Sequence, residues 1–384
     1  MKENKKKIAV FIDWFLPGYK AGGPITSVTN IIENLKNEFE FFLVTSDRDL
    51  GDSESYKDIV KNEWLKKDGF SIIYITPEKQ NIKTYGSILK TVDFDFLYFN
   101  SLYSLKFTIL PVFIAKKTYK KKQIVLAPRG MLGKGAVEIK TIKKKLFFII
   151  SNLIGLFRGI VWHSTDDVET NDIKKTFGQK EIVKNIPNIP ILPSEYFPKH
   201  TIVPRKFLFY SRISKKKNLY FALEILKKTN TNQNIYFDII GPIEDNKYWS
   251  ECQALILELP KNIFVEYKGD IPPNLIIKTL KEYHFLFLPT MHENFGHSIF
   301  EAFVAGCLVI VSDQTPWRNL LEKNIGWDLP LNKPELFVDA LLSCTKLTAD
   351  EYDEMSRKVY KFALDFVEKQ NLVEKTKKLF DELN

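Results

Sequence analysis

Short apolar runs recur along the first half of the chain, with longer segments of mixed polarity between them. The runs are rich in β-branched and aromatic residues and do not alternate with polar positions, so they predict strands buried on both faces of a parallel sheet. Helical spacing of apolar residues between the runs favours βαβ units. The predicted strands are 8–12, 41–44, 72–75, 96–99, 124–127 and 160–163, and the clearest helices between them are 25–35 and 104–117.

The alternation stops at residues 185–198 and then starts again. This stretch, NIPNIPILPSEYFP, holds four prolines, which interrupt helices and cannot donate to a strand ladder. We interpret it as a linker between two domains. Beyond it the predicted strands are 207–210, 235–240, 263–267, 285–288 and 308–311, the helices are 219–228, 248–259, 275–283 and 298–305, and a helical tail covers about 350–383.

This pattern predicts an α/β fold with two Rossmann-like domains that face each other across a cleft. The N-terminal domain is expected at residues 1–190, the C-terminal domain at 191–365 and a C-terminal helix at 366–384. A length of 384 residues suits two domains, because single cores stop growing near about 250–300 residues. In open α/β sheets ligands bind beyond the carboxyl ends of the strands, so functional residues are expected there.

The composition narrows the choice of partner and compartment. The formal net charge of +9 suits ligands that carry phosphate, although a lysine-rich solvated surface explains it equally well. Neither zinc-finger spacing nor the aromatic signature of RNA-binding sheets occurs, which argues against nucleic acid. The three cysteines lack metal-ligand spacing and favour a reducing compartment. Because the N-terminal apolar run is short and no apolar stretch reaches about 20 residues, we expect a cytoplasmic protein.

The most informative segment follows the predicted strand 285–288. It contains Glu293 and Glu301, with Gly296 between them for a tight turn, and a helix opens near His297. The first N–H groups of a helix attract phosphate or sugar hydroxyls, and a carboxylate one turn inside can accept both vicinal hydroxyls of a ribose. Alternatively, both glutamates are surface carboxylates, which the helix dipole favours at this end. The flanking strand, the glycine and the apolar helix favour the functional interpretation.

A second segment, YSRISKKKNL at 210–219, follows the first predicted strand of the second domain. Arg212 can bind a phosphate through two parallel hydrogen bonds, and Lys217 supplies a compact positive charge. Such a clamp stabilises the charge that develops on a departing nucleoside diphosphate. A solvated basic loop is the alternative, and we expect Lys215 and Lys216 to be no more than that.

These two segments resemble the retaining GT-B glycosyltransferases of glycosyltransferase family 4, also called glycosyl transferases group 1. That family has an Arg…Lys pair after the first strand of its C-terminal domain, and a Glu, seven residues, Glu motif before a Gly-bounded strand. Arg212, Lys217, Glu293 and Glu301 match these motifs in order, and EAFVAGCLVIV continues the match. The long C-terminal helix resembles the one that crosses back to the N-terminal domain.

The resemblance implies a role for each matched residue. Arg212 and Lys217 would bind the donor diphosphate and stabilise the leaving group. Glu301 would hold the ribose, and Glu293 would lie beside the transferred sugar. No metal or other cofactor is expected, because the Arg/Lys pair can supply the positive charge. Further donor contacts are expected from Phe295, Gly296, His297, Ser298 and Gly23, with His292 as a candidate.

The N-terminal half carries weaker signals. Gly22 and Gly23 look like the family's glycine-rich turn between the first strand and the first helix, although a Gly–Gly pair alone is more often a plain turn. Arg129 stands where many family members place a histidine near the donor sugar. It could meet a phosphate or an acidic sugar, or anchor the acceptor.

Two further residues lie near the linker, and the first of them, His163, is a candidate for the N-terminal wall of the cleft. His163 ends a predicted strand. Alternatively, it has a structural role, with its ring hydrogen-bonded to the backbone or to Asp166. Asn188 resembles the asparagine of the family's Pro-Asn-Gly turn, with Ile189 where glycine is usual.

Residues 134–157 combine a lysine cluster with an apolar helical stretch. Such a segment could dock on an anionic bilayer and reach a lipid-linked acceptor. We favour the alternative, an ordinary helix packed on the sheet with its lysines on the wet face.

The function expected from these observations is transfer of a hexose-type sugar from a nucleotide diphosphate donor, with retention, to a glycan or lipid-linked acceptor. The resemblance places this activity in the synthesis of bacterial surface polysaccharide such as lipopolysaccharide, at the inner face of the membrane. A nucleotide-sugar epimerase of the same fold and a non-catalytic sugar-nucleotide-binding protein are the alternatives.

Overall fold

The chain divides into two compact units. The computed structural model describes residues 5–119, 122–133, 141–193, 195, 196, 198, 199 and 205–381, without the side chains of 141–145. Unit 1 consists of Met1–Ile189 together with Asn371–Asn384, and unit 2 is Pro190–Gln370. The C-terminal segment therefore packs with unit 1, although it follows unit 2 in sequence.

Unit 1 is built on an eight-stranded sheet in the order β3-β4-β2-β1-β5-β6-β7-β8. Neighbouring strands in the described residues are parallel, except that β3 runs antiparallel to β4 at the edge. The strand order reverses between β1 and β5. The strands are β1 (Lys7–Phe11), β2 (Glu40–Ser46), β3 (Trp64–Lys67), β4 (Phe70–Ile75), β5 (Phe96–Phe99), β6 (Gln123–Leu126), β7 (Val161–Ser164) and β8 (Ile182–Asn185).

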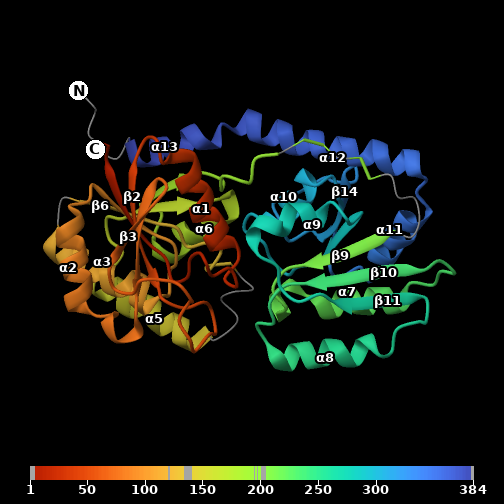
Figure 1. Cartoon of the computed structure of the whole chain (residues 1–384), viewed down its shortest axis with the longest axis horizontal. Helices are drawn as coiled ribbons and strands as arrows, with labels where there is room; N and C mark the ends of the chain where they lie inside the picture. Colours follow the sequence, from red (N-terminus) through yellow and green to blue (C-terminus); the bar gives the residue numbers. More distant parts are fainter. Residues whose placement is uncertain are drawn as a thin grey trace. The chain divides into compact units, whose positions relative to one another are not determined.

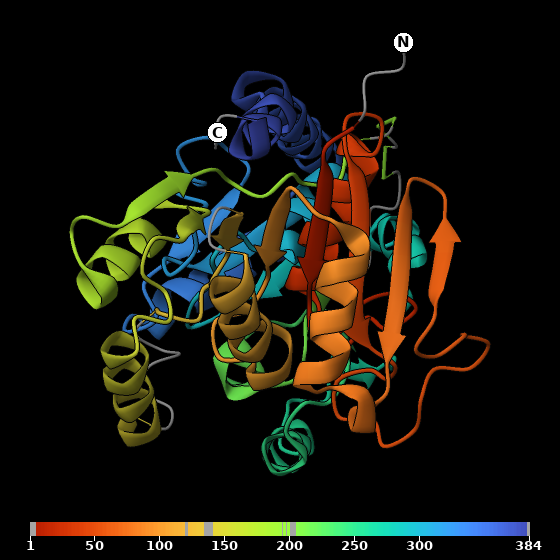
Figure 2. The same cartoon turned by 90° about the vertical axis from the view of Figure 1, so that its left-hand side faces the viewer.

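Helices cover both faces of this sheet. Figures 1 and 2 show α2 and α3 on one face, and Figure 1 shows α1 on the other. The C-terminal helix α13 contacts α1 and inserts Phe380, whose ring lies 5.7 Å from that of Phe39 and 5.5 Å from that of Tyr98. The helices are α1 (Gly23–Leu35), α2 (Ile82–Val92), a π-helical turn (Leu105–Ile109), α3 (Leu110–Thr118), α5 (Thr141–Leu153), α6 (Asp167–Phe177) and α13 (Leu372–Asp381).

Unit 2 has a six-stranded parallel sheet in the order β11-β10-β9-β12-β13-β14. This is the doubly wound 3-2-1-4-5-6 order of dinucleotide-binding folds, and it reverses between β9 and β12. The strands are β9 (Lys206–Tyr210), β10 (Ile235–Ile240), β11 (Ile263–Tyr267), β12 (Phe285–Leu288), β13 (Leu308–Ser312) and β14 (Gly326–Leu329). The helices are α7 (Leu219–Lys228), α8 (Asn246–Ile256), α9 (Ile276–Leu280), α10 (His297–Val304), α11 (Pro334–Lys346) and α12 (Ala349–Gln370).

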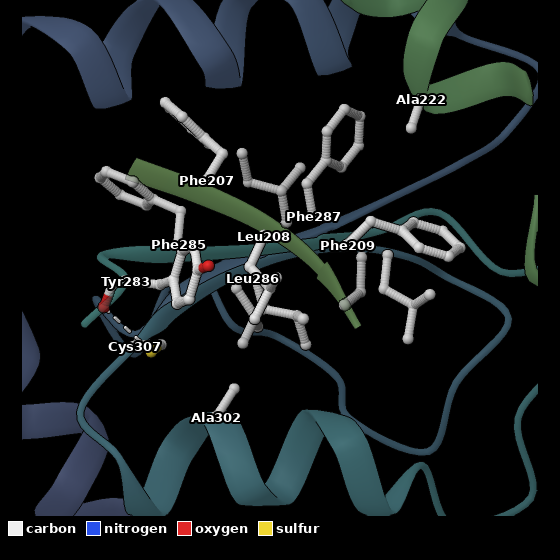
Figure 3. Close-up of a cluster of buried hydrophobic side chains, with 14 of the residues drawn as sticks. Phe207, Leu208, Phe209, Ala222, Tyr283, Phe285, Leu286, Phe287, Ala302 and Cys307 are labelled. Carbon is white, nitrogen blue, oxygen red and sulfur yellow. Dashed lines mark hydrogen bonds between the residues drawn. The ribbon is translucent and has the colours of Figure 1, made fainter. Parts of the chain in front are cut away.

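The core of unit 2 lies on both sides of its central strands. Leu208 and Leu286 point towards Ala302 of α10, whereas Phe287 points to the opposite face, where Ala222 of α7 lies (Figure 3). All of these residues are at most 1% exposed. Burial on both faces explains why these strands are continuous apolar runs, and it fixes the central strand positions that carry the loops described below.

The predicted α/β fold class with two Rossmann-like domains is confirmed for each unit. Three strands, β3, β8 and β14, were not predicted, because their sequences WLKK, IVKN and GWDL mix polar with apolar residues at sheet edges. The predicted helix 104–117 is divided into a π-helical turn and α3, with Pro111 in the first turn of α3.

Substitution of Leu286 by Ala in β12 tests the packing of unit 2. The side chain is fully buried, so its truncation should lower the free energy of unfolding by about 2–5 kcal/mol through lost burial and a residual cavity. The measurement is urea unfolding followed by circular dichroism. The control is Leu257→Ala, because that side chain is 88% exposed and should change stability by less than about 0.5 kcal/mol. Equal effects of the two substitutions would contradict the described packing.

Candidate functional site

The two motif segments of unit 2 leave the sheet on either side of its switch point. Residues 211–218 follow β9, and residues 289–296 follow β12. Because these adjacent parallel strands are connected to helices on opposite faces, the crevice in which doubly wound folds bind ligands is expected beyond their carboxyl ends. The fold therefore brings both segments to the place where a ligand is expected.

An ion pair joins the two segments at this point. The Lys217 ammonium is bonded to the Glu293 carboxylate, and the side chains are only 12% and 9% exposed. Backbone contacts fix the two loops together, since the amide of Met291 donates to the carbonyl of Lys216 at 2.8 Å. The side-chain amide of Asn218 donates to the carbonyl of Pro289 at 3.0 Å. The pair is thus held by its backbone frame as well as by its charges.

Further charges surround this pair. Burial alone would raise the pKa of Glu293, but the charges of Lys217 and Lys216 outweigh it and leave the pKa below its ordinary value. Burial lowers the pKa of Lys216 to about 8, and the charges of Lys217 and Arg212 add to this effect. Burial and Lys216 also lower the pKa of His292. The expectation that Lys216 is only a solvated lysine is therefore wrong: its burial and the neighbouring charges make it part of the site.

Arg212 lies at the rim of the same cluster. Its guanidinium forms an ion pair with Glu244 at 2.9 Å and is 28% exposed. The backbone before it is tightly packed, because a Cβ on Gly241 (φ +143°) would lie 2.0 Å from the carbonyl oxygen of Ser211. Glycine is therefore required at the end of β10 to let the Arg212 loop pass.

Glu301 lies on the inner side of α10, 6% exposed. Its carboxyl group is hydrogen-bonded to the hydroxyl of Tyr210, the last residue of β9. Burial raises the pKa of Glu301 to about 7, and the bond to Tyr210 offsets this only in part. Tyr210 stands two positions before Arg212, so Glu301 belongs to the same crevice. Once it is ionised, the carboxylate of Glu301 can accept hydrogen bonds from hydroxyl groups.

The start of α10 completes the site in unit 2. Gly296 takes a left-handed conformation (φ 76°) as the N-cap of the helix, and the indole N–H of Trp317 donates to the carbonyl of Phe295 at 2.7 Å. The ring of His297 lies 4.9 Å from that of Phe295. His297 and Ser298 are half-buried in the first turn of α10, where the positive end of the helix dipole favours anions.

In unit 1, Arg129 is held by a polar network. Its guanidinium donates to Asn100 Oδ1 at 2.7 Å and to the Tyr98 hydroxyl at 2.8 Å, and it is also bonded to Asn188 Oδ1. The carboxylate of Glu169 accepts from the amide of Gly130 at 2.6 Å and so fixes the turn that carries Arg129. Arg129 remains half-buried, with a rigidly oriented charge.

His163 does not present its ring to a ligand, so the expectation that it lines a binding wall is corrected. The side chain is 1% exposed, Nε2–H donates to the carbonyl of Ile186 at 2.9 Å, and Nδ1 accepts from the Tyr98 hydroxyl at 2.8 Å. Burial lowers its pKa to about 3, with a further contribution from the charge of Arg129. Of the two alternatives, the backbone-bonded histidine is the one observed. Asp166 instead caps α6.

A pocket of about 380 Å³ lies beyond the switch point of unit 1. Its lining includes Asp13 after β1 and Ser104 after β5, and the Ser104 hydroxyl donates to the Asp13 carboxylate. Burial raises the pKa of Asp13 despite this bond. The remaining lining residues include Trp14, Ser46, Arg48, Asp49, Gln80 and Lys106. The mixture of two aromatic residues, Trp14 and Phe107, with hydrogen-bonding groups of both kinds suits a polyhydroxyl ligand.

The Gly22–Gly23 pair forms the turn before α1, as expected. Gly22 is the N-cap with φ 67°, and a Cβ there would meet no atom within 4 Å. The space above this turn is open, so the glycine is required by its backbone conformation.

Several residues of these sites were not identified from the sequence. Lys216 was dismissed as solvated, and Tyr210 and Glu244 were not considered. Asp13 carried a usable signal, since a carboxylate directly after a buried first strand of a Rossmann-like sheet lies at the ligand-binding edge.

Comparison with known proteins agrees with this arrangement. Residues 194–362 match the family model Glycosyl transferases group 1. The matched range lies within unit 2 and contains Arg212, Lys217, Glu293 and Glu301. No curated protein sequence matches the chain.

Solved structures resemble the chain over nearly its whole length. Sucrose-phosphate synthase from Thermosynechococcus elongatus has a TM-score of 0.73 at 13% identity, covering 99% of both chains. HepE from Anabaena, in complex with UDP and glucose, has a TM-score of 0.69 at 13% identity, covering 98% of this chain and 99% of that one. WaaG, a glycosyltransferase involved in lipopolysaccharide biosynthesis, has a TM-score of 0.65 at 14% identity, covering 98% and 99%. The chain has the GT-B fold of these proteins.

Within the described residues, no helix has the length and apolar character to cross a bilayer. The same part of the chain contains no group of three or more His, Cys, Asp or Glu residues positioned to hold a metal ion.

The raised pKa of Glu301 predicts a pH-dependent contribution to stability. The folded protein holds this proton up to about pH 7, whereas the unfolded chain loses it near 4.5, so the contribution falls as the pH rises between these values. The total loss is about 3 kcal/mol. Glu301→Gln keeps an acceptor for Tyr210 and removes the titration. The difference between the unfolding free energies of the two proteins should therefore change from pH 4.5 to 7 in favour of the variant. A difference independent of pH would show that Glu301 is not a buried titrating group.

Proposed function

We propose that the protein is a glycosyltransferase that moves a hexose-type sugar from a nucleoside diphosphate donor to a glycan or lipid-linked acceptor, with retention at the anomeric carbon. The observation that carries the proposal is the cluster at the switch point of unit 2. There Lys217 and Glu293 meet, Lys216 and Arg212 add positive charge, and the buried Glu301 lies beside them.

The positive groups would bind the diphosphate of the donor. Arg212 offers a planar guanidinium for two phosphate oxygens, while Lys216 and Lys217 supply point charges from inside the crevice. In this structure Glu293 neutralises Lys217. A phosphate would take over that role and leave the carboxylate of Glu293 available to the hydroxyls of the sugar. Backbone amides of Gly296, His297 and Ser298 at the start of α10 would contact the same phosphate or the sugar.

Glu301 would hold the ribose of the nucleotide. A carboxylate with a raised pKa gains most from a ligand that donates hydrogen bonds, since two vicinal hydroxyls stabilise its ionised form. HepE, whose solved complexes include UDP-glucose, supports a nucleotide sugar as the donor class. The resemblance to glycosyltransferase family 4 supports the individual roles.

The proposed transfer needs no base from the protein, and its atoms and charges balance. The oxygen of an acceptor hydroxyl forms a bond to the anomeric carbon as the bond from that carbon to the diphosphate oxygen breaks. The acceptor proton passes to the departing phosphate, and the products are the glycoside and the nucleoside diphosphate. Arg212 and Lys217 stabilise the charge on the leaving group, and Glu293 supports the positive charge at the anomeric carbon.

The acceptor would bind to unit 1. The pocket lined by Asp13, Trp14 and Gln80 has the hydrogen-bonding groups to hold a sugar, and the carboxylate of Asp13 can accept its hydroxyls. Arg129, fixed by Asn100 and Asn188, would provide a rigid positive charge on this side. A role in bacterial surface polysaccharide synthesis in the cytoplasm is proposed on the resemblance and on likeness to WaaG.

Substitution of Lys217 tests donor binding. A screen of UDP, GDP, ADP and TDP and their sugars by thermal shift should identify a ligand that raises the melting temperature, because it binds only the folded state. Lys217→Ala should then weaken the affinity for that ligand by about 10- to 100-fold in titration calorimetry, through loss of a charge-assisted contact. The double variant Lys217→Ala with Glu293→Gln avoids an unpaired buried carboxylate.

The neighbouring Lys215 provides the matched control for this substitution. It is exposed, so Lys215→Ala should leave the affinity unchanged. Equal losses in both variants would mean that only the overall basic charge attracts the nucleotide, as expected for a nucleic-acid binder.

Substitution of Glu293 by Gln separates binding from transfer. Since the carboxylate competes with phosphate for Lys217, the variant should bind the nucleoside diphosphate at least as tightly as the native protein, while sugar transfer falls by about 100-fold or more. Transfer to water or to a lipid extract is followed as nucleoside diphosphate release. The exposed Glu322→Gln serves as the control. An altered sugar on an intact donor would identify an epimerase, and binding without release in the native protein would identify a non-catalytic binder.

A further inference from the structure

Helix α5 of unit 1 exposes an apolar face. Leu146, Ile149, Ile150 and Leu153 are spaced so that they lie on one side of a helix. Their exposed fractions are 55%, 57%, 48% and 81%, and Ile154, directly after the helix, is 61% exposed. A surface helix of a globular protein normally presents polar residues on this side. The face therefore lacks the side chains that make a helix surface compatible with water.

The opposite face of α5 is already used to pack the helix on unit 1. The rings of Phe147 and Phe148 lie 5.4 and 6.0 Å from that of Tyr103, and Phe148 lies 5.6 Å from Phe177 of α6. Rotation of the helix would expose these phenylalanines instead. In Figure 2, α5 (olive) lies at the edge of unit 1, in agreement with the exposed fractions of its aliphatic side chains.

Comparison with α12 shows how unusual this face is. The exposed face of α12 carries the ion pairs Arg357–Asp353 and Lys358–Glu354. Residues 146–154, LFFIISNLI, include no charged residue. The lysines expected on the wet face fall at 134–145, whose side chains lie outside the described residues, and the exposed face of the described part of α5 is apolar. An exposed apolar face of this size marks an interaction surface.

Positive charge adjoins the apolar face in sequence. Lys143, Lys144 and Lys145 lie in the first turns of α5, and residues 134–140, which fall outside the described residues, hold two more lysines and one glutamate. At the other end, Arg158 is exposed and the Lys116 ammonium is bonded to its carbonyl at 2.7 Å. In sequence, the helix thus begins with basic residues and is followed by another, Arg158.

The basic residues around α5 indicate what kind of partner covers its apolar face. In a two-fold dimer across α5, the lysines of one copy would face either the same lysines or Arg158 and Lys116 of the other copy, and like charges would repel. An anionic lipid surface offers what both features need, an apolar layer beneath phosphate groups.

We propose that the aliphatic face of α5 docks on an anionic lipid bilayer, with Leu146, Ile149, Ile150 and Leu153 at the boundary between headgroups and acyl chains. A helix of 13 residues is too short to cross the bilayer and would lie along its surface. This inference goes beyond the proposed glycosyl transfer and does not depend on it. Together with that function, it would bring unit 1 to acceptors carried on lipid.

The test is co-sedimentation with vesicles of phosphatidylcholine, with and without phosphatidylglycerol, at low and high salt. The native protein should bind the vesicles that contain phosphatidylglycerol, less at high salt. The double variant Ile149→Gln with Leu153→Gln should lower the partition coefficient by about tenfold or more, because glutamine preserves helix propensity but not apolar insertion. The control is Leu257→Gln with Leu321→Gln, which removes two exposed leucines of unit 2 and should leave vesicle binding unchanged.

Each other outcome overturns the proposal. Absence of vesicle binding would do so, as would equal losses in the α5 variant and the control. Light scattering on the same proteins shows whether α5 mediates a dimer, and a dimer abolished by the α5 substitutions would assign the face to a second copy. Nucleotide-induced thermal shifts should be the same in all these variants, so failure of membrane docking and failure of the proposed function can be told apart.

Discussion

The buried ion pair between Lys217 and Glu293 is the contact on which the site of unit 2 depends. It connects the loops after β9 and β12, which come from positions 76 residues apart in sequence. A buried pair of this kind contributes little net stability, because desolvation of both charges offsets their attraction, yet loss of one partner is costly. Its physical effect is to keep opposite charges desolvated and oriented at the point where the strand order reverses. In the proposed function, a diphosphate would replace one carboxylate as the partner of Lys217 in a loop that is already in place.

In both units the candidate site lies where the strand order of the sheet reverses, but the side chains at the two sites differ. In unit 2 the reversal between β9 and β12 collects three positive side chains and the carboxylates of Glu244, Glu293 and Glu301, and the positive groups suit a phosphorylated ligand. In unit 1 the reversal between β1 and β5 opens a pocket with Asp13, Trp14 and Gln80, which suits a polyhydroxyl one. The polar network around Arg129 buries His163 as a neutral link between Tyr98 and the backbone, and thereby sets the direction of the arginine. Topology explains where the sites lie, and the loop residues decide what they bind.

Much of the fold followed from the sequence because central strands are buried on both faces. The central strands 96–99, 235–240 and 285–288 were predicted with the bounds observed, as largely apolar runs between turns. The edge strand β3 escaped because one of its faces meets water and its sequence reads WLKK. The Arg/Lys and Glu/Glu motifs were visible in sequence, but the place of Lys216 was not, since it depends on the loop after β12, whose Met291 and Thr290 donate hydrogen bonds to the Lys216 carbonyl. For α5, apolar residues on both faces left the orientation undetermined until the phenylalanines were seen packed inwards.

The central claim is that the crevice of unit 2 is shaped for a nucleoside diphosphate. The most direct test is a crystal structure of the protein with the nucleoside diphosphate that stabilises it most. In that structure, phosphate oxygens should lie within hydrogen-bond distance of Lys217 and Arg212, ribose hydroxyls should be bonded to Glu301, and Glu293 should be released from Lys217. A nucleotide bound elsewhere, with Lys217 and Glu293 still paired and Glu301 still bonded to Tyr210, would contradict it.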